Sequence, residues 1–196
     1  MSGRPLALDD IADARAYERE RESFRTSIIE LKKRRRIGVG PVISVVFENR
    51  DTIRFQIQEM ARAERLLSDA AIQTELDTYN PLIPGPGELS ASMYIELTNR
   101  EEMEHWLPRL VGIERAVQII VGASVVPCIV DESHAAHLTR EEITAAVHFV
   151  RFELTPGQIE SFRSEPVFVA IDHPAYQERT ELLPASRDSL LADLLG

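Results

Sequence analysis

The sequence predicts an α+β fold with a mixed sheet, and three observations lead to this prediction. Apolar runs rich in β-branched residues, such as PVISVVF at 41–47, alternate along the chain with amphipathic segments of helical period. Two of these alternations are built alike, each as a strand, a helix and a second strand. Hydrophobic residues make up 44% of the 196 residues, which is enough for a packed core. We expect one domain, 1–196.

A long helix is expected near the start of the chain. Asp9 or Asp10 can cap it, and it runs to about Leu31, before Gly38 and Gly40. Its apolar residues form a narrow stripe on a charged cylinder, so the helix should lie across the body or pack on a second copy, as in a homodimer. The stripe consists of Tyr17, Phe24, Ile28 and Leu31.

A β-hairpin and two shorter helices should complete the first part of the chain, 1–80. The apolar run 41–47 reads as one strand, and 52–57 as its partner after a turn at 48–51. The chain then becomes helical, and a further helix is expected over 70–78 with Ser68 or Asp69 as its cap.

The second part, 88–196, follows a proline-rich loop, TYNPLIPGPGE, which is the best candidate for a subdomain boundary. It holds the two strand–helix–strand units, which start at SMYIELT and VHFVRFELT, and a C-terminal amphipathic helix. Such units in tandem allow a ferredoxin-like arrangement. Thr98 and Thr155 are the expected N-caps, because Glu101 and Gln158 follow at capping-box spacing.

Charge and cysteine content exclude several classes of protein. A net charge of -10 makes this an acidic protein and disfavours a nucleic-acid partner, and one cysteine, Cys128, excludes an internal disulfide. No apolar stretch is long enough for a membrane span and the start of the chain lacks a signal-peptide core, so we expect a cytoplasmic protein. The basic run Lys32 to Arg36 has two readings, a helix end that favours cations or a patch for an acidic partner.

Histidines and carboxylates supply the candidates for chemistry. His148 alternates with core residues and reads as a buried histidine, whereas His173 ends an apolar strand beside Asp172, where an oriented base could lie. His134 and His137 have a spacing that can bind a metal from one helix face. No nucleotide-binding or hydrolase motif is present in the sequence.

Six ordered segments resemble a bacterial family catalogued only as domain of unknown function 3501. They are LKKRRRIGVGP, VVFENRDTIRFQIQEMARAE, ELDTYNPLIP, LVGIE, TAAVHFVRFEL and DHPAY. The resemblance covers nearly the whole chain and supplies no activity, but it implies an association with rubrerythrin-like and iron–sulfur redox proteins. Carried onto this chain, the family pattern marks Gln58, Glu59, Arg62, Tyr79, Asn80, His148, Arg151, His173 and Tyr176.

Three functions follow as hypotheses. The first is an accessory or binding protein of a redox system, with a polar pocket where the Glu59 helix meets the strands of His148 and His173. Its ligand, a partner protein or a small anion, would be bound by Gln58, Glu59, Arg62, Tyr79, Asn80, Arg151 and Tyr176. The second is a metal-dependent redox enzyme that holds iron, manganese or zinc with His148, His173 and Glu59. The third is a structural scaffold in which these groups form a buried polar network.

Overall fold

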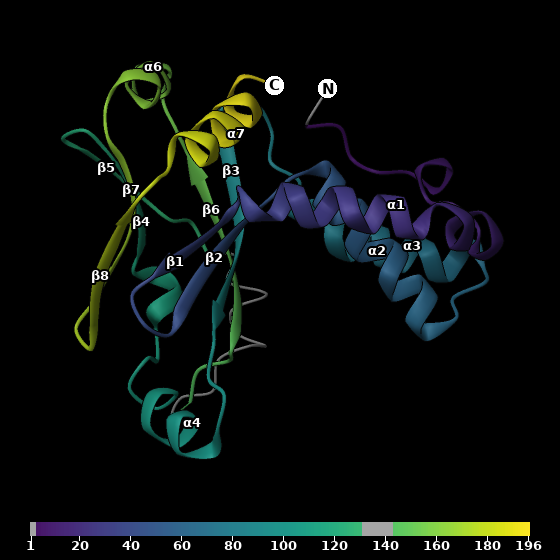
Figure 1. The fold of residues 1–196 in the computed structure, drawn as a ribbon, viewed down its shortest axis with the longest axis horizontal. Helices are drawn as coiled ribbons and strands as arrows, with labels where there is room; N and C mark the ends of the chain where they lie inside the picture. The colour runs from purple at the N-terminus through teal and green to yellow at the C-terminus, as the bar shows by residue number, and fades with distance from the viewer. Residues whose placement is uncertain (1–2, 131–142) are drawn as a thin grey trace.

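The chain folds into a helical lobe and a strand lobe that lie side by side in the computed structural model (Figure 1). The structure describes residues 3–130 and 143–196. The helical lobe comprises the N-terminal segment (residues 3–13), α1, α2 and α3, and the strand lobe comprises two sheets with α4, α6 and α7. None of the helices within the described ranges is both long and apolar enough to span a bilayer.

The helical lobe begins with a short 3-10 turn, Leu8–Asp10. The first long helix, α1, spans Ala14–Lys33, and its cap is Asp13 rather than the expected Asp9 or Asp10. Asp13 accepts hydrogen bonds from the backbone N–H groups of Arg15 and Ala16. α2 spans Arg50–Glu64, α3 spans Asp69–Tyr79 with Ser68 as its predicted cap, and a 3-10 turn covers Asn80–Leu82.

The predicted hairpin is wrong in its second strand. Residues 52–57 belong to α2, because Asn49 caps that helix and Thr52 completes a capping box with it. A hairpin is present one strand earlier, between β1 (Arg36–Val39) and β2 (Ile43–Glu48). The alternating apolar residues at 53, 55 and 57 include the pair Ile53 and Ile57, which are four apart and face the core of the helical lobe together.

The α+β class is confirmed, but the strands form two antiparallel sheets instead of one mixed sheet. The first sheet has the order β1-β2-β3-β6, with β3 at Glu88–Ile95 and β6 at Val147–Glu153. The second has the order β5-β4-β7-β8, which are Ser124–Pro127, Val117–Val121, Val167–His173 and Tyr176–Glu181. Every printed strand pair in both sheets is antiparallel.

Both strand–helix–strand units are present, and each crosses from the first sheet to the second. One unit is β3–α4–β4, with α4 at Arg100–Trp106, and the other is β6–α6–β7, with α6 at Pro156–Ser164. A ferredoxin-like single sheet is therefore not formed. Thr155 and Gln158 make the predicted capping box, whereas Asn99 caps α4 in place of Thr98. A further 3-10 turn covers Ile113–Arg115.

The two sheets pack through one continuous apolar cluster. β2, β3 and β6 supply Val45, Met93 and Phe152, and β4 and β7 supply Ile119 and Val169, all of them fully or almost fully buried. The C-terminal helix α7, Pro184–Leu195, closes this core with Leu190 and Leu194. The helical lobe has a separate and much smaller cluster, made of Leu6, Ile53, Ile57, Leu76 and Ile83.

Candidate functional site

A cavity of about 410 Å³ lies in the helical lobe, between the N-terminal segment and helices α1, α2 and α3. We call it the helical cavity. Its lining is mostly apolar, with charged side chains among it. The lining residues are Leu8, Ile11, Ala12, Asp13, Ala14, Tyr17, Glu18, Gln58, Ala61, Arg62, Arg65, Leu66, Leu67, Asp69 and Ile72.

Gln58 fixes one wall of the helical cavity. This side chain is 1% exposed, and its amide pairs with the backbone of Ala12 in both directions. Gln58 Oε1 accepts from Ala12 N at 2.7 Å, and Gln58 Nε2 donates to Ala12 O at 3.2 Å. A buried amide whose oxygen and nitrogen each have a backbone partner holds the N-terminal segment in place.

Asn80 and two arginines hold the rest of the N-terminal segment in the same way. Asn80 pairs with both backbone groups of Leu6, at 2.8 and 2.9 Å. Arg54 Nε donates to Asp10 O at 2.9 Å, and Arg50 Nε donates to Arg4 O at 3.1 Å. The segment has little regular structure, so its backbone hydrogen bonds go to these side chains.

Glu59 lies behind the cavity wall and joins α2 to α1. Both of its carboxylate oxygens accept from the Arg21 guanidinium at 2.8 Å, and the Tyr17 hydroxyl donates to Oε1 at 2.6 Å. The Arg21 hydrogen bonds, followed by that of Tyr17, lower the pKa of Glu59 to about 2 against its partial burial. Burial and the neighbouring Glu59 raise the pKa of Tyr17, so the phenol stays protonated.

Arg62 and Arg65 stand at the open side of the cavity. Arg62 Nε donates to the carboxylate of Glu18 on α1, and about half of each side chain is exposed. Arg65 ends α2 in the left-handed region with φ of 56°, and its side chain is exposed. Leu67, which is 83% exposed, follows at the same rim.

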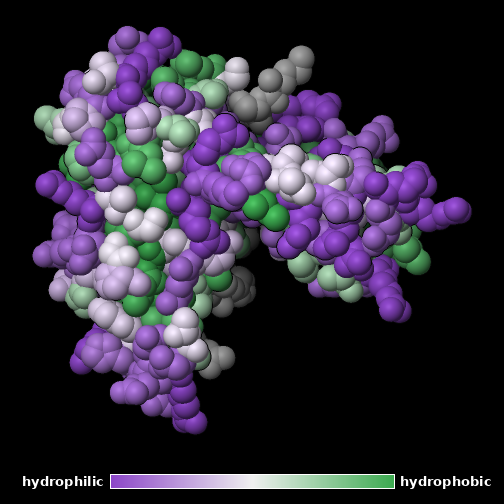
Figure 2. Space-filling model, in the orientation of Figure 1, coloured by the Kyte–Doolittle hydropathy of each residue, from purple (hydrophilic) through white to green (hydrophobic). Residues whose placement is uncertain are grey.

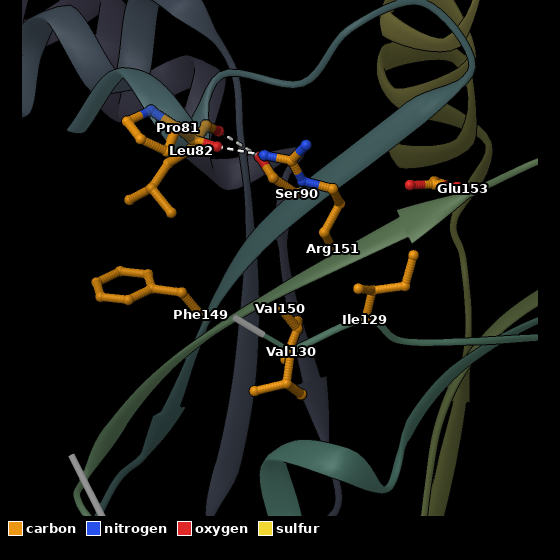
Figure 3. A pocket seen from close by; sticks show the side chains of 9 residues that line it. All are labelled: Pro81, Leu82, Ser90, Ile129, Val130, Phe149, Val150, Arg151 and Glu153. Carbon is orange, nitrogen blue, oxygen red and sulfur yellow. Dashed lines mark hydrogen bonds between the residues drawn. The ribbon is translucent and has the colours of Figure 1, made fainter. Parts of the chain in front are cut away.

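A second cavity, of about 300 Å³, lies against β3 and β6 of the first sheet (Figure 3). Leu82, Ile129, Val130 and Phe149 give it an apolar lining. At the edge of this cavity, Arg151 donates to the carbonyl of Pro81, and its Nη1 lies 3.4 Å from Oε2 of Glu88. We call this the strand cavity. Arg151 and Arg62, which were expected to act together on one ligand, therefore belong to different cavities.

Tyr79 and Tyr176 lie in neither cavity lining. Tyr79 packs against the apolar cluster of the helical lobe. Tyr176 is buried in the strand lobe, where its hydroxyl donates to Val39 O at 2.6 Å and accepts from Val42 N at 3.3 Å. A side chain on Gly40, which has φ of 70°, would collide with this hydroxyl. Tyr176 thus fastens the β1–β2 turn to the second sheet.

His148 is the buried histidine that its pattern predicts. Its Nε2 lies 2.8 Å from Thr144 Oγ1 and 2.9 Å from the carbonyl of Ala145, and its exposure is 1%. Because a carbonyl only accepts, Nε2 carries the proton, and Nδ1 faces Glu114 Oε2 at 4.0 Å. Burial lowers the pKa of His148 although the Glu114 carboxylate opposes this shift.

The prediction that His173 and Asp172 form an oriented base is wrong, because His173 has other partners. β7 continues through both residues, so their side chains point to opposite faces. His173 Nε2 lies 3.1 Å from Val111 O, and its Nδ1 accepts from Ala175 N at 3.2 Å. Asp172 accepts instead from Gln177 at 3.2 Å.

The structure does not bring His148, His173 and Glu59 together. Glu59 is in the helical lobe, bound to α1, while the two histidines are on strands of different sheets. Across residues 3–130 and 143–196, no group of three or more His, Cys, Asp or Glu side chains is placed to hold a metal ion. His134 and His137 lie outside the described residues. The helical cavity differs from the expected pocket, because it lies between α2 and the other elements of the helical lobe and not between α2 and the strands of His148 and His173.

Sequence reasoning missed several residues that shape the site. Tyr17 and Arg21 bind Glu59, but in the sequence they are one stripe residue and one of many charges on a helix. The helix-end reading of the basic run holds for Lys32 and Lys33, which lie in the last turn of α1, whereas Arg35 is 1% exposed and pairs with Asp193 of α7. The thiol of Cys128 donates to Glu114 O at 3.0 Å, and burial raises its pKa to about 11.

Comparison with known proteins places most of the chain in one family. Residues 5–194 match the family model described as protein of unknown function (DUF3501). A crystal structure of a novel protein of unknown function from Burkholderia pseudomallei K96243 is similar, with a TM-score of 0.89 and 36% identity. The similarity covers 97% of this chain and 100% of the other. No curated protein matches the chain.

Proposed function

The chain belongs to the DUF3501 family, and we propose that it is an accessory binding protein whose ligand occupies the helical cavity. The observation that carries this proposal is an open, mostly apolar volume of about 410 Å³ enclosed by elements that are fastened to one another by hydrogen bonds. Small-molecule sites in proteins occupy roughly 300–1,000 Å³ and combine an apolar lining with a few polar groups.

The polar groups on the inner walls of the cavity favour an apolar ligand body. Gln58 and Tyr17 are buried, and each is already paired, with Ala12 and Glu59 respectively. A ligand that placed a polar atom beside them would exchange its hydrogen bonds to water for the few that these paired groups can still make. The inner part of the ligand is therefore hydrocarbon or aromatic.

The rim of the cavity also favours a ligand that is partly apolar. Leu67 is 83% exposed and Leu8 is 36% exposed, although both are aliphatic. Covering exposed leucine at the mouth of a cavity gains free energy, because apolar surface leaves water. The ligand body thus extends from the inner wall to this rim.

A neutral fluorescent probe tests the proposal. N-phenyl-1-naphthylamine has an aromatic body without charge, and its emission rises when it enters an apolar site. We expect saturable binding to the protein and loss of that binding in Ala61→Phe, because this side chain fills the cavity from α2. Ala63→Phe is the matched control, since Ala63 is on the same helix but is exposed and outside the lining.

Two results would contradict the proposal. One is a protein that does not bind the probe at all, and the other is binding that Ala61→Phe leaves unchanged. The circular dichroism spectra of both variants show whether the helices are retained.

A protein partner completes the proposal. The family resemblance implies a rubrerythrin-like or iron–sulfur redox system, and we propose such a partner as the setting in which the bound ligand is used. This part rests on the resemblance alone. The test is co-purification with a tagged chain expressed in its native organism. Enrichment of a redox protein supports the proposed partner, and enrichment of a protein of another class contradicts it.

A further inference from the structure

The polar end of the ligand must lie at the rim of the helical cavity, because the inner polar groups are already paired. Five charged residues line the cavity: Asp13, Glu18, Arg62, Arg65 and Asp69. Which of them remain available for a ligand decides what charge the ligand carries.

Four of these five charged groups are already compensated. The carboxylate of Asp13 accepts from the backbone N–H groups of Arg15 and Ala16, both at 2.9 Å. These hydrogen bonds lower the pKa of Asp13. Glu18 accepts from Arg62, so this pair is neutral overall. Asp69 occupies the first turn of α3, where an acidic side chain faces the positive end of the helix dipole.

Arg65 is the cation that remains. Within the described parts of the chain, no carboxylate lies within ion-pair distance of its guanidinium, and its side chain is exposed at the rim. An exposed arginine with free donors can form two parallel hydrogen bonds to a carboxylate, sulfonate or phosphate group.

The backbone at Arg65 is also unusual. Its φ of 56° is the only left-handed value at a non-glycine residue in residues 3–130 and 143–196. Glycine is the usual residue at the end of a helix in this conformation, because a Cβ makes it unfavourable. The chain thus places a long cation where its backbone would favour glycine.

Three helix ends lie at the rim, the N-terminal ends of α1 and α3 and the C-terminal end of α2 at Arg65. α1 begins beside Asp13 and α3 begins at Asp69, and both of these residues line the cavity. The N-terminal end of a helix carries a partial positive charge, so these two ends favour an anion nearby, whereas the C-terminal end of α2 carries a partial negative charge that Arg65 offsets.

We propose that the ligand of the helical cavity is an amphipathic organic anion, with its apolar body in the cavity and its acidic group against Arg65. This inference rests on the proposed function, since it assigns a ligand class to the same cavity. It excludes neutral lipids and organic cations as the preferred ligands.

Two probes of matched shape test the charge of the ligand separately from its fit. 1-Anilinonaphthalene-8-sulfonate is N-phenyl-1-naphthylamine with one added sulfonate. We expect the wild-type protein to bind the sulfonate probe about fivefold more tightly than the neutral probe, as one exposed charge-assisted contact allows. Ala61→Phe should abolish the binding of both.

Three rim variants assign the charge effect to Arg65. Arg65→Gln and Arg65→Gly should both remove the preference for the sulfonate probe, measured as the ratio of the dissociation constants of the two probes for each variant. Arg65→Gly relieves the backbone, so its thermal midpoint should not fall, and a loss of sulfonate binding then cannot come from unfolding. Asp69→Asn should strengthen sulfonate binding, because it removes a negative charge from the same rim.

The outcomes separate the two proposals. Equal binding of both probes, or a preference for the sulfonate that survives in Arg65→Gln, overturns the assignment of an anionic ligand while the cavity remains a binding site. If neither probe binds, or if Ala61→Phe binds both as well as the wild type does, the proposed function fails and this inference fails with it.

Discussion

The two lobes of this protein are stabilised by different interactions. The strand lobe has one large apolar cluster shared by both sheets, with Phe47 and Phe152 fully buried inside it. The helical lobe has five buried apolar residues in its cluster and depends more on side chains that pair with backbone or with one another. Figure 2 shows the same contrast on one face, where hydrophilic residues cover most of the helical lobe. The helical cavity, in the lobe with the smaller core, has a volume of about 410 Å³, against about 300 Å³ for the strand cavity.

The first prediction concerns the buried ion pair between Arg35, which lies between α1 and β1, and Asp193 of α7. Arg35 is 1% exposed and donates to Asp193, to Ser189 and to the carbonyls of Phe47 and Glu48. Arg35→Ala leaves a buried carboxylate without its partner, which costs about 3–5 kcal/mol of unfolding free energy. Chemical denaturation measures this loss.

The adjacent arginine is the control for this prediction. Arg36 pairs with Glu96, and about half of each side chain is exposed, so Arg36→Ala should cost at most about 1 kcal/mol. Equal losses in the two variants would show that burial does not distinguish the two arginines.

A smaller effect is expected within the helical lobe. Gln58→Ala leaves the backbone N–H and C=O of Ala12 without their partners, which costs about 1–3 kcal/mol. The loss should be accompanied by faster amide exchange in residues 6–13 and no change in β2 or β3. Gln73→Ala is the matched control, because Gln73 is exposed on α3, and it should stay within about 0.5 kcal/mol of the wild type.

The third prediction is that the stability of the protein depends on pH through Glu59, which lies in the helical lobe. Because the pKa of Glu59 falls from 4.5 to about 2 on folding, the unfolded chain binds more protons between these values. The stabilisation is fully present above about pH 4.5 and is lost as the pH falls toward 2. We expect it to amount to about 1–2 kcal/mol, after allowance for the partial exposure of the pair.

Glu59→Gln should remove this acid-sensitive part of the stability. Unfolding measured from pH 6 to pH 3 should give a flatter profile for the variant than for the wild type. Glu18→Gln is the control, because Glu18 is more exposed and should leave the slope unchanged. A Glu59→Gln variant with the wild-type slope would contradict the role of the Arg21 and Tyr17 contacts.

Much of the fold could be predicted from local patterns, and the exceptions have physical causes. The capping signals at Ser68 and Thr155 located two helices correctly. The alternation of Ile53, Phe55 and Ile57 predicts a strand over 52–57, although Asn49 and Thr52 carry the capping box of a helix. The edge strand β8 was missed because its sequence, YQERTE, is mostly polar and exposed.

Only the α2 side of the candidate site could be predicted from the sequence. Gln58 and Arg62 could be grouped from their spacing on α2, and both line the helical cavity. Their partners, Ala12 and Glu18, are more than forty positions away and belong to another element, so no local pattern points to them. The association of Glu59 with distant histidines was based on ligand type alone, and the sheet order places those histidines elsewhere.

Hydrogen–deuterium exchange with and without N-phenyl-1-naphthylamine is the most direct test of the helical lobe as the binding lobe. We predict slower exchange on probe binding in residues 8–18 and 58–72, which surround the helical cavity, and unchanged exchange in the strands of both sheets. Slower exchange confined to residues around the strand cavity would contradict this account and place the ligand against β3 and β6.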